Sequence, residues 1–264
     1  MTGVFSGEIT DMFISLRQIK DLGNALTLLI PQERLAKAET VFIKPNLGYP
    51  SPYPITTSLE SLKVTIDYLK AMKDDLTIEV GEGSTSRTSS YENAKNLGVI
   101  AFLQREKIQF IDLDQDDFEV VDGIGVPNTV TNADLRISLP CIKIFRQSEL
   151  VLSCAVKNYL GIPPRALHSE EIIHRRDSFH KDINNSVAEV YRVIQKVAPF
   201  EMHIVDGTRI LIGQENIGRE KNWGRIIVGP NADEIDMALC EKFGLKLPLY
   251  LLFLRDFRSM PLDA

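Results

Sequence analysis

Short apolar runs that alternate with amphipathic stretches constrain the fold of this chain more than any other feature. The run at residues 41–43 precedes apolar side chains at helical spacing from Ser58, which suits a helix N-cap, and the run at 76–80 precedes a helical pattern over 90–96. Buried strands that alternate with amphipathic helices are typical of α/β proteins. The sequence therefore predicts an α/β fold with a mixed, mostly parallel sheet flanked by helices.

The remaining elements are expected from the same patterns. Four more strands are predicted over 108–113, 134–140, 202–207 and 226–229, and two more helices over 182–197 and 234–243. The apolar tail at 247–254 is expected to be a last strand in the sheet, and a homodimer contact is the alternative. We expect one α/β domain over residues 1–264, with any boundary between two lobes near residue 135.

Two Lys/Asn pairs follow apolar runs and define the candidate site. Lys44 and Asn46 come directly after the run at 41–43, and Lys157 and Asn158 come after a second run. Open α/β sheets bind ligands beyond the ends of their strands. Both pairs are therefore expected to converge on one pocket for a carboxylate or phosphate. The alternative is that each pair lies on an ordinary surface turn, where asparagine is common.

A Gly-x-Gly segment lies between a predicted strand and a predicted helix. Glycines allow a close backbone approach, and free amides at a helix N-terminus favour an anion. The segment lacks the lysine of a Walker loop and the third glycine of the dinucleotide fingerprint. Gly81, Gly83 and Ser84 are candidate ligand-binding residues. A glycine-rich turn with serines that cap the helix is the alternative.

Five motifs in a fixed order carry a family resemblance. They are I-K-P-N-L-G, V-G-E-G-S, A-V-K-N-Y-L-G-I-P-P, I-V-D-G and V-G-P-N-A-D-E-I-D-M-A. Over residues 40–245 the chain resembles the family called domain of unknown function 362. Many relatives carry a ferredoxin-like iron–sulfur segment, and the family is distantly similar to lactate-racemase-type α/β proteins. The resemblance implies an α/β fold and an iron–sulfur redox partner, and it implies little about the reaction.

The resemblance also points to individual residues. Lys143 is a third candidate ligand-binding lysine. Relatives often show Lys-Thr-His where this chain has Lys143 followed by Ile and Phe, so the family-like histidine is absent and Arg146 could replace it as a charge but not as a base. The resemblance places a histidine soon after the Gly-Ile-Pro-Pro-Arg turn, and His168 matches it. Asp236 matches a family aspartate, as a group that orients the site or as part of the acidic first turn of a helix.

Lys157, Asp206 and His168 are the candidate catalytic residues. A lysine at the edge of the core could abstract a proton, form a Schiff base or simply hold an anion. Asp206 is expected at the end of a strand, where it could orient a lysine or bind a divalent metal, and an aspartate turn is the alternative. His168, His174 and His180 could converge on a metal with Asp206, or His168 alone could be functional, or all three could be polar loop residues.

Composition excludes several classes of protein. A net charge of −6 argues against a general nucleic-acid binder. No window has the ~18 apolar residues of a membrane span, and the first residues lack the features of a signal peptide, so a cytoplasmic location is expected. Three widely spaced cysteines, Cys141, Cys154 and Cys240, favour buried thiols, and an intrinsic iron–sulfur cluster is not expected.

Two functions remain in view. The first is an enzyme that binds an anionic small molecule and uses acid/base or redox-linked chemistry. The second is a non-catalytic accessory protein that binds a ligand or metal and works with an iron–sulfur redox partner. Lys44, Lys157 and Asp206 in one cleft would favour the enzyme, and scattered positions would favour the accessory protein.

Overall fold

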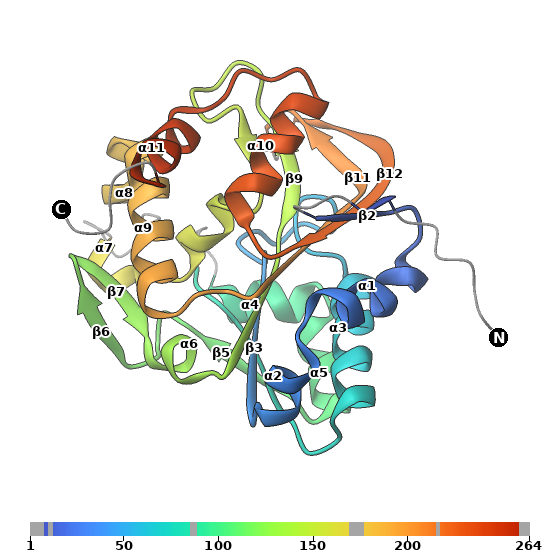
Figure 1. Ribbon diagram of the computed structural model, residues 1–264. Coiled ribbons are helices and arrows are strands. Elements are labelled where there is room, and N and C mark those ends of the chain that lie inside the picture. The colour runs from blue at the N-terminus through green and yellow to red at the C-terminus, as the bar shows by residue number, and fades with distance from the viewer. Residues whose placement is uncertain (1–7, 10–12, 85–88, 169–176, 215–216, 259–264) are drawn as a thin grey trace.

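A computed structural model describes residues 8–9, 13–84, 89–168, 177–214 and 217–258 (Figure 1). It contains one large sheet and one small hairpin. The strands are β1 (Glu8–Ile9), β2 (Ile14–Leu16), β3 (Thr40–Pro45), β4 (Thr77–Glu82), β5 (Gln109–Asp112), β6 (Phe118–Val121), β7 (Ile124–Pro127), β8 (Leu135–Leu139), β9 (Cys141–Ile144), β10 (Leu152–Ser153), β11 (Met202–Ile212) and β12 (Arg219–Gly229).

The helices lie mostly between the strands along the chain. They are η1 (Ile19–Asp21), α1 (Leu22–Leu29), α2 (Gln32–Lys37), α3 (Leu59–Met72), α4 (Ser90–Asn96), α5 (Val99–Glu106), α6 (Asn128–Asn132), η2 (Lys157–Gly161), α7 (Arg165–His168), α8 (Asp177–Lys181), α9 (Ile183–Val197), α10 (Ala232–Lys242) and α11 (Leu249–Arg258). Three of them begin at a side-chain cap, because Ser58, Ser89 and Asp182 each accept a backbone N–H three residues ahead.

The large sheet runs in the order β1-β2-β12-β11-β8-β3-β4-β5, and β9 pairs with both β10 and β11. Its centre is parallel, since β5, β4, β3, β8 and β11 all point the same way. Antiparallel pairing is confined to β1, β2, β12 and the short β10. The predicted fold class, a mixed and mostly parallel sheet flanked by helices, is confirmed.

Side chains from alternate positions of a strand enter two different apolar layers. In β3, Val41 and Ile43 pack with α1, α3 and α5, whereas Phe42 packs with α9, α10 and α11 on the other face. In β12, Ile226 and Ile227 divide in the same way. This period of two is the geometry of a strand covered on both faces, and Figure 1 shows the helices on either side of the sheet.

Two sequence predictions about element boundaries are wrong. From Leu249 onward the tail at 247–254 is part of helix α11 and not a strand, and Tyr250, Leu251 and Leu254 are buried at helical spacing where α11 packs along α9. The strand expected to end at Asp206 continues as β11 to Ile212. Among the described residues, no helix is long and apolar enough to cross a bilayer.

Candidate functional site

A buried ion pair lies at the carboxyl ends of the two adjacent parallel strands β3 and β4. Lys44 Nζ is 2.7 Å from Glu82 Oε1, and both side chains are only 2% exposed. Glu82 also accepts hydrogen bonds from the backbone N–H groups of Leu47, at 2.9 Å, and Gly83, at 3.0 Å. A buried carboxylate that keeps its charge needs such donors. The pair therefore forms a fixed floor at this edge of the sheet.

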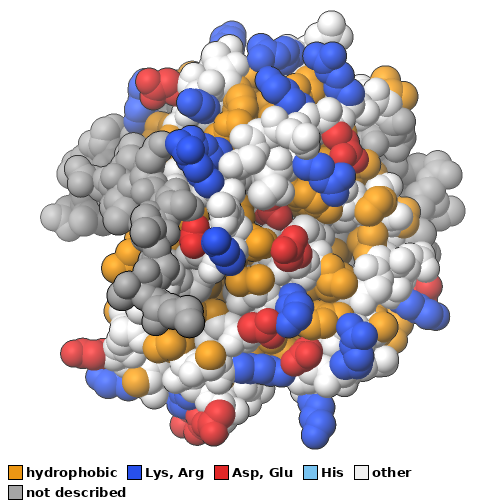
Figure 2. Space-filling view, turned by 90° about the vertical axis from the view of Figure 1, so that its right-hand side faces the viewer, with side chains coloured by type: hydrophobic (Ala, Val, Ile, Leu, Met, Phe, Trp, Pro, Cys, Tyr) orange, Lys and Arg blue, Asp and Glu red, His pale blue; other side chains and the backbone are white. Residues whose placement is uncertain are grey.

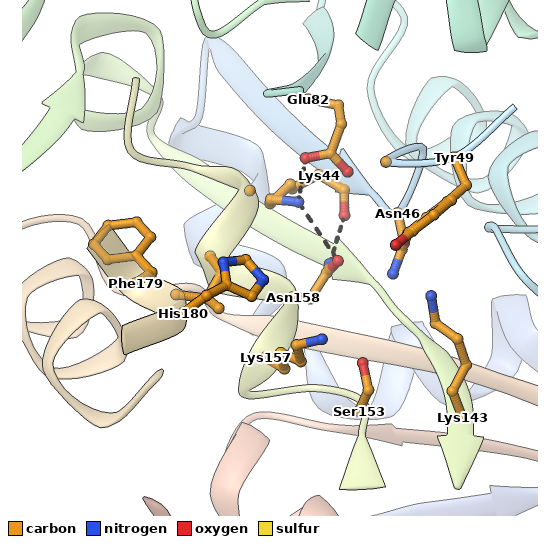
Figure 3. A pocket seen from close by; sticks show the side chains of 13 residues that line it. Lys44, Asn46, Tyr49, Glu82, Lys143, Ser153, Lys157, Asn158, Phe179 and His180 are labelled. Carbon is orange, nitrogen blue, oxygen red and sulfur yellow. Dashed lines mark hydrogen bonds and ion pairs between the residues drawn. The ribbon is translucent and has the colours of Figure 1, made fainter. Parts of the chain in front are cut away.

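Asn158, from η2, connects the lysine to the neighbouring strand β8. Its amide nitrogen donates to Ser138 Oγ at 2.9 Å and to the Lys44 carbonyl at 3.4 Å. Its side-chain oxygen lies 3.5 Å from Lys44 Nζ (Figure 3). Lys44 and Ser138 are directly paired in the sheet, so Asn158 bridges two adjacent positions of β3 and β8. This bridge fixes the start of η2 over the sheet edge.

Gly161 allows η2 to approach the ion pair closely. A Cβ atom at this position would overlap Glu82 Oε1 and lie 2.8 Å from Lys44 Nζ. The Gly161 carbonyl accepts a hydrogen bond from the Gly83 amide at 3.0 Å, which holds the two segments together. Glycine is therefore required here by contact and not by an unusual backbone angle.

A small pocket opens above this floor. Its volume is about 90 Å³. Its described lining residues are Lys44, Asn46, Gly48, Tyr49, Glu82, Lys143, Ser153, Lys157, Asn158, Leu160, Gly161, Phe179 and His180 (Figure 3). These described lining residues include three lysines and one glutamate, and no arginine or aspartate. The lining therefore carries net positive charge although the whole chain is acidic. We call this space the lysine pocket.

The three lysines reach the lysine pocket from three separate segments. Lys44 comes from β3, Lys143 from β9 and Lys157 from η2. Lys143 is buried, with its Nζ 5.4 Å from the centre of the Tyr49 ring. Lys157 is half-buried at the pocket wall. Cations that arrive from distant parts of the chain at one small space create a local positive potential.

A larger cleft adjoins the lysine pocket. Its volume is about 830 Å³, and Tyr49, Lys157 and His180 line both spaces. Its other described lining residues are Ile144, Phe145, Arg146, Gln147, Ser148, Leu150, Ile183, Ile212, Gly213, Gln214 and Ile217. We call this second space the outer cleft.

Asp236, from α10, holds the segment that leads into η2. Its carboxylate accepts the backbone N–H groups of Ala155, at 2.9 Å, and Val156, at 3.1 Å, and the Tyr250 hydroxyl at 3.0 Å. Burial raises the pKa of this fully buried carboxyl to about 6. Since Lys157 is the next residue after Val156, Asp236 positions the lysine without touching the pocket. This is the orienting role proposed for it from the sequence.

The Gly-x-Gly segment contacts the protein's own carboxylates. The Gly83 amide donates to Glu82, and the Ser84 amide donates to Asp114 Oδ2 at 2.8 Å. Gly81 packs against the Phe42 ring, where a Cβ atom would lie 2.6 Å away. Ser84 Oγ accepts from the Ser90 amide at the start of α4, at 2.9 Å. Gly81, Gly83 and Ser84 are not among the described residues that line the lysine pocket.

Asp206 lies apart from the lysine pocket, in the middle of β11. Its carboxylate accepts the hydroxyls of Tyr53, Ser58 and Ser61 at 2.7–2.8 Å. It also accepts the amide and hydroxyl of Thr208, at 3.0 and 2.8 Å. Desolvation and the Asp206 charge raise the pKa of Tyr53. Asp206 thus joins β11 to the start of α3, and the structure does not bring it together with Lys44 and Lys157.

The histidines of this region also lie in different surroundings. His168 is buried in α7, and its ring stacks on Phe179 with the centroids 4.3 Å apart. His180, which was not singled out from the sequence as a functional histidine, is exposed and lines both the lysine pocket and the outer cleft. His174 lies outside the described residues. Over the described parts of the chain, no three His, Cys, Asp or Glu side chains are grouped as a metal site would need.

Sequence reasoning named all three lysines that line the pocket and overlooked Glu82, the carboxylate that pairs with Lys44. Lys44, Asn46, Lys143, Lys157 and Asn158 all line one pocket. Glu82 was overlooked although it stands inside the V-G-E-G-S motif, between the two glycines that were selected. Its position at the end of an apolar strand was the available signal. Tyr49 and His180 carry no pattern that distinguishes them from surface residues.

Comparison with known proteins gives a family and solved structures of similar fold. The lactate racemase apoprotein from Thermoanaerobacterium thermosaccharolyticum is similar in structure, with a TM-score of 0.49 and 14% sequence identity, over 88% of this chain. The chain spans 57% of the length of that protein. No curated protein matches the chain significantly. The family model described as "Domain of unknown function (DUF362)" matches residues 41–241, and the chain belongs to this family.

Proposed function

We propose that the protein binds an anionic small molecule, a carboxylate or a phosphate, in the lysine pocket. The observation that carries the proposal is the convergence of Lys44, Lys143 and Lys157 on about 90 Å³, with Glu82 as the one acidic side chain among the described lining residues. Glu82 is already paired with Lys44. An anion in this space would accept charge-assisted hydrogen bonds from the lysines that line it.

The surroundings support a local rather than a general attraction for anions. On the face that Figure 2 shows, basic and acidic side chains are interspersed and no extended surface has a single sign. The chain as a whole carries a charge of −6. A positive pocket in an acidic protein selects ligands by contact inside the pocket, because screening weakens long-range attraction at physiological ionic strength.

Substitution of Lys157 by alanine tests the proposal. Isothermal titration calorimetry with inorganic phosphate and with acetate should show binding to the native protein, and affinity should fall at least about tenfold in Lys157→Ala, as expected when a charge-assisted contact is lost. The free energy of unfolding should change little, because Lys157 is half-buried. Lys63→Ala is the matched control, since Lys63 is an exposed lysine on α3.

Two results would contradict this assignment. Unchanged affinity in Lys157→Ala would remove Lys157 from the site. A loss of several kcal/mol in the free energy of unfolding, roughly that of a broken buried ion pair, would make Lys157 a structural residue. In that case the lysine pocket would be a structural feature and not a binding site.

Proton transfer next to a bound carboxylate is the reaction class that the pocket favours. Its support is that Lys157 and His180 both line the junction of the lysine pocket and the outer cleft, where a general acid and a general base could face one ligand. Exchange of the α-hydrogens of small 2-hydroxy acids in heavy water, followed by NMR, tests it. No exchange above the rate without protein would favour the accessory function, in which the ligand is only held.

A further inference from the structure

The size of the lysine pocket limits which part of a ligand it can hold. The lysine pocket has about 90 Å³, which is several times less than the 830 Å³ of the outer cleft. Sites for complete metabolites usually have about 300–1,000 Å³. A ligand that enters the lysine pocket must therefore extend beyond it unless it is only a small ion.

The outer cleft is the space into which such a ligand would extend. It has about 830 Å³ and meets the lysine pocket at Tyr49, Lys157 and His180. Side chains from three segments form its walls: the turn between β9 and β10, the start of α9, and the turn between β11 and β12. The two spaces are thus adjacent compartments with the half-buried Lys157 between them.

The chemistry of the outer cleft differs from that of the lysine pocket. Six of its described lining residues are aliphatic or phenyl side chains: Ile144, Phe145, Leu150, Ile183, Ile212 and Ile217. Its described lining also includes two basic side chains, Arg146 and Lys157, and no acidic side chain. The Arg146 guanidinium donates to the Phe243 carbonyl at 3.2 Å, which holds it at the rim. Such a lining favours an apolar body and disfavours a cationic one.

We propose that the ligand of this protein is an elongated acid, whose carboxylate or phosphate head occupies the lysine pocket and whose apolar body occupies the outer cleft. The inference rests on the proposed function, because it requires the anion site. In addition, the affinity for a ligand should increase with the apolar surface that the ligand buries in the outer cleft. Each methylene that is fully buried contributes about fourfold in affinity.

Two homologous series of ligands test the inference by calorimetry. The first comprises inorganic phosphate, methyl phosphate and hexyl phosphate, and the second comprises acetate and hexanoate. Hexyl phosphate should bind at least about tenfold more tightly than methyl phosphate, since five further methylenes enter a partly open cleft. The series whose short members bind more tightly identifies the head group.

Two variants locate the body of the ligand. Ile183→Trp places a larger side chain in the outer cleft and should reduce the advantage of the hexyl chain while inorganic phosphate binds as before. Ile217→Asn provides a second variant that preserves the fold, because Ile217 is 82% exposed. It should reduce the advantage of the hexyl chain by about threefold or less, since one contact is lost.

The outcomes separate the two proposals. Short anions that bind with no gain from the hexyl chain would overturn the elongated ligand and leave the anion site intact. A gain that is undiminished in both Ile183→Trp and Ile217→Asn would place the body outside the outer cleft and would overturn the inference as well. If no member of either series binds, the proposed function fails and the inference fails with it.

Discussion

Two buried clusters at the same sheet show how differently an ionised side chain can be used. In the cluster around Lys44, the cation has one carboxylate partner, Glu82, and further lysines line the open space beside it. In the cluster around Asp206, hydroxyls and an amide surround the carboxylate on both oxygens. Both central groups are buried, at 1% and 4% exposure.

The difference lies in the balance of charge within each cluster and in whether a cavity adjoins it. Asp206 accepts from four residues and links β11 to α3, so its hydrogen-bonding capacity is used within the fold. The lysine pocket collects more cations than acids along its described lining. A cluster that satisfies itself stabilises the fold, and a cluster with excess charge of one sign beside a cavity is suited to a ligand. Each prediction below tests one side of this contrast.

Loss of the Lys44 cation should have the largest effect on stability. In Lys44→Met, Glu82 would keep the backbone donors Leu47 and Gly83 but lose the buried ammonium group that lies 2.7 Å from it. We expect the free energy of unfolding to fall by about 3–5 kcal/mol. Urea denaturation at neutral pH measures this change.

The double variant Lys44→Met/Glu82→Gln is the control for that measurement. Removing both charges leaves no uncompensated carboxylate, so most of the lost stability should return. If Lys44→Met alone unfolds at the same urea concentration as the native protein, the ion pair does not stabilise the fold and the floor of the lysine pocket is adaptable.

Removal of the Asp206 carboxylate should reduce stability without affecting the ligand. In Asp206→Ala, the buried Ser61 hydroxyl loses its carboxylate acceptor and the half-buried Tyr53 hydroxyl keeps only the Arg209 carbonyl of its two strong acceptors, and we expect a loss of roughly 2–4 kcal/mol. Affinity for inorganic phosphate should stay within about twofold, because distant sites act independently. A large loss of affinity in a folded Asp206→Ala protein would show that Asp206 acts on the ligand, as first expected from the sequence.

Asp236 should contribute a dependence of stability on pH. Burial raises its pKa from 3.8 to about 6, so the folded protein binds this proton more tightly than the unfolded chain does. The free energy of unfolding therefore falls as the pH rises from about 4 to about 6, by at most about 3 kcal/mol. Asp236→Asn should lack this fall, and urea denaturation of both proteins at several pH values measures the difference.

His203 also titrates differently in the folded and unfolded protein, so the pH dependence must be compared between the native protein and Asp236→Asn. Burial lowers the pKa of His203 to about 4, so its contribution to stability is lost as the pH falls below its ordinary value of 6.5. This dependence has the opposite sign and is common to the native protein and Asp236→Asn, so it cancels in the difference. Identical pH profiles for the two proteins would show that the Asp236 carboxyl does not titrate in this range.

The fold was largely predictable because strands and helices alternate clearly along the chain. The tail at 247–254 was not, since a continuous apolar run has no period that distinguishes a helix from a strand. Gly207 was misleading for a different reason. It was expected to end a strand, but the strand continues, and a Cβ atom at this position would lie 2.5 Å from the Trp223 ring on β12. That contact depends on a residue sixteen positions away along the chain, which no local pattern contains.

The candidate site was predictable only where its residues end apolar runs. Lys44 and Lys157 have this signature, and the structure brings both to one pocket. Asp206 has a similar local sequence but lies in the other cluster, because its partners Tyr53 and Ser58 come from the opposite end of the chain. His180 faces the pocket through the placement of α8 against α9, which is a tertiary contact. Local sequence identified the polar strand ends and could not say what each would meet.

The contact between Tyr250 and Asp236 sets how much of the chain works as one unit. The match to the family ends at residue 241, yet Tyr250 lies beyond it, donates to Asp236 and is itself anchored through its amide to Asn184 Oδ1, at 3.2 Å. Because Asp236 holds Ala155 and Val156, the last described helix supports the segment that carries Lys157. A shortened protein that stops at the family boundary would keep every lysine of the pocket and lose part of the support that orients one of them.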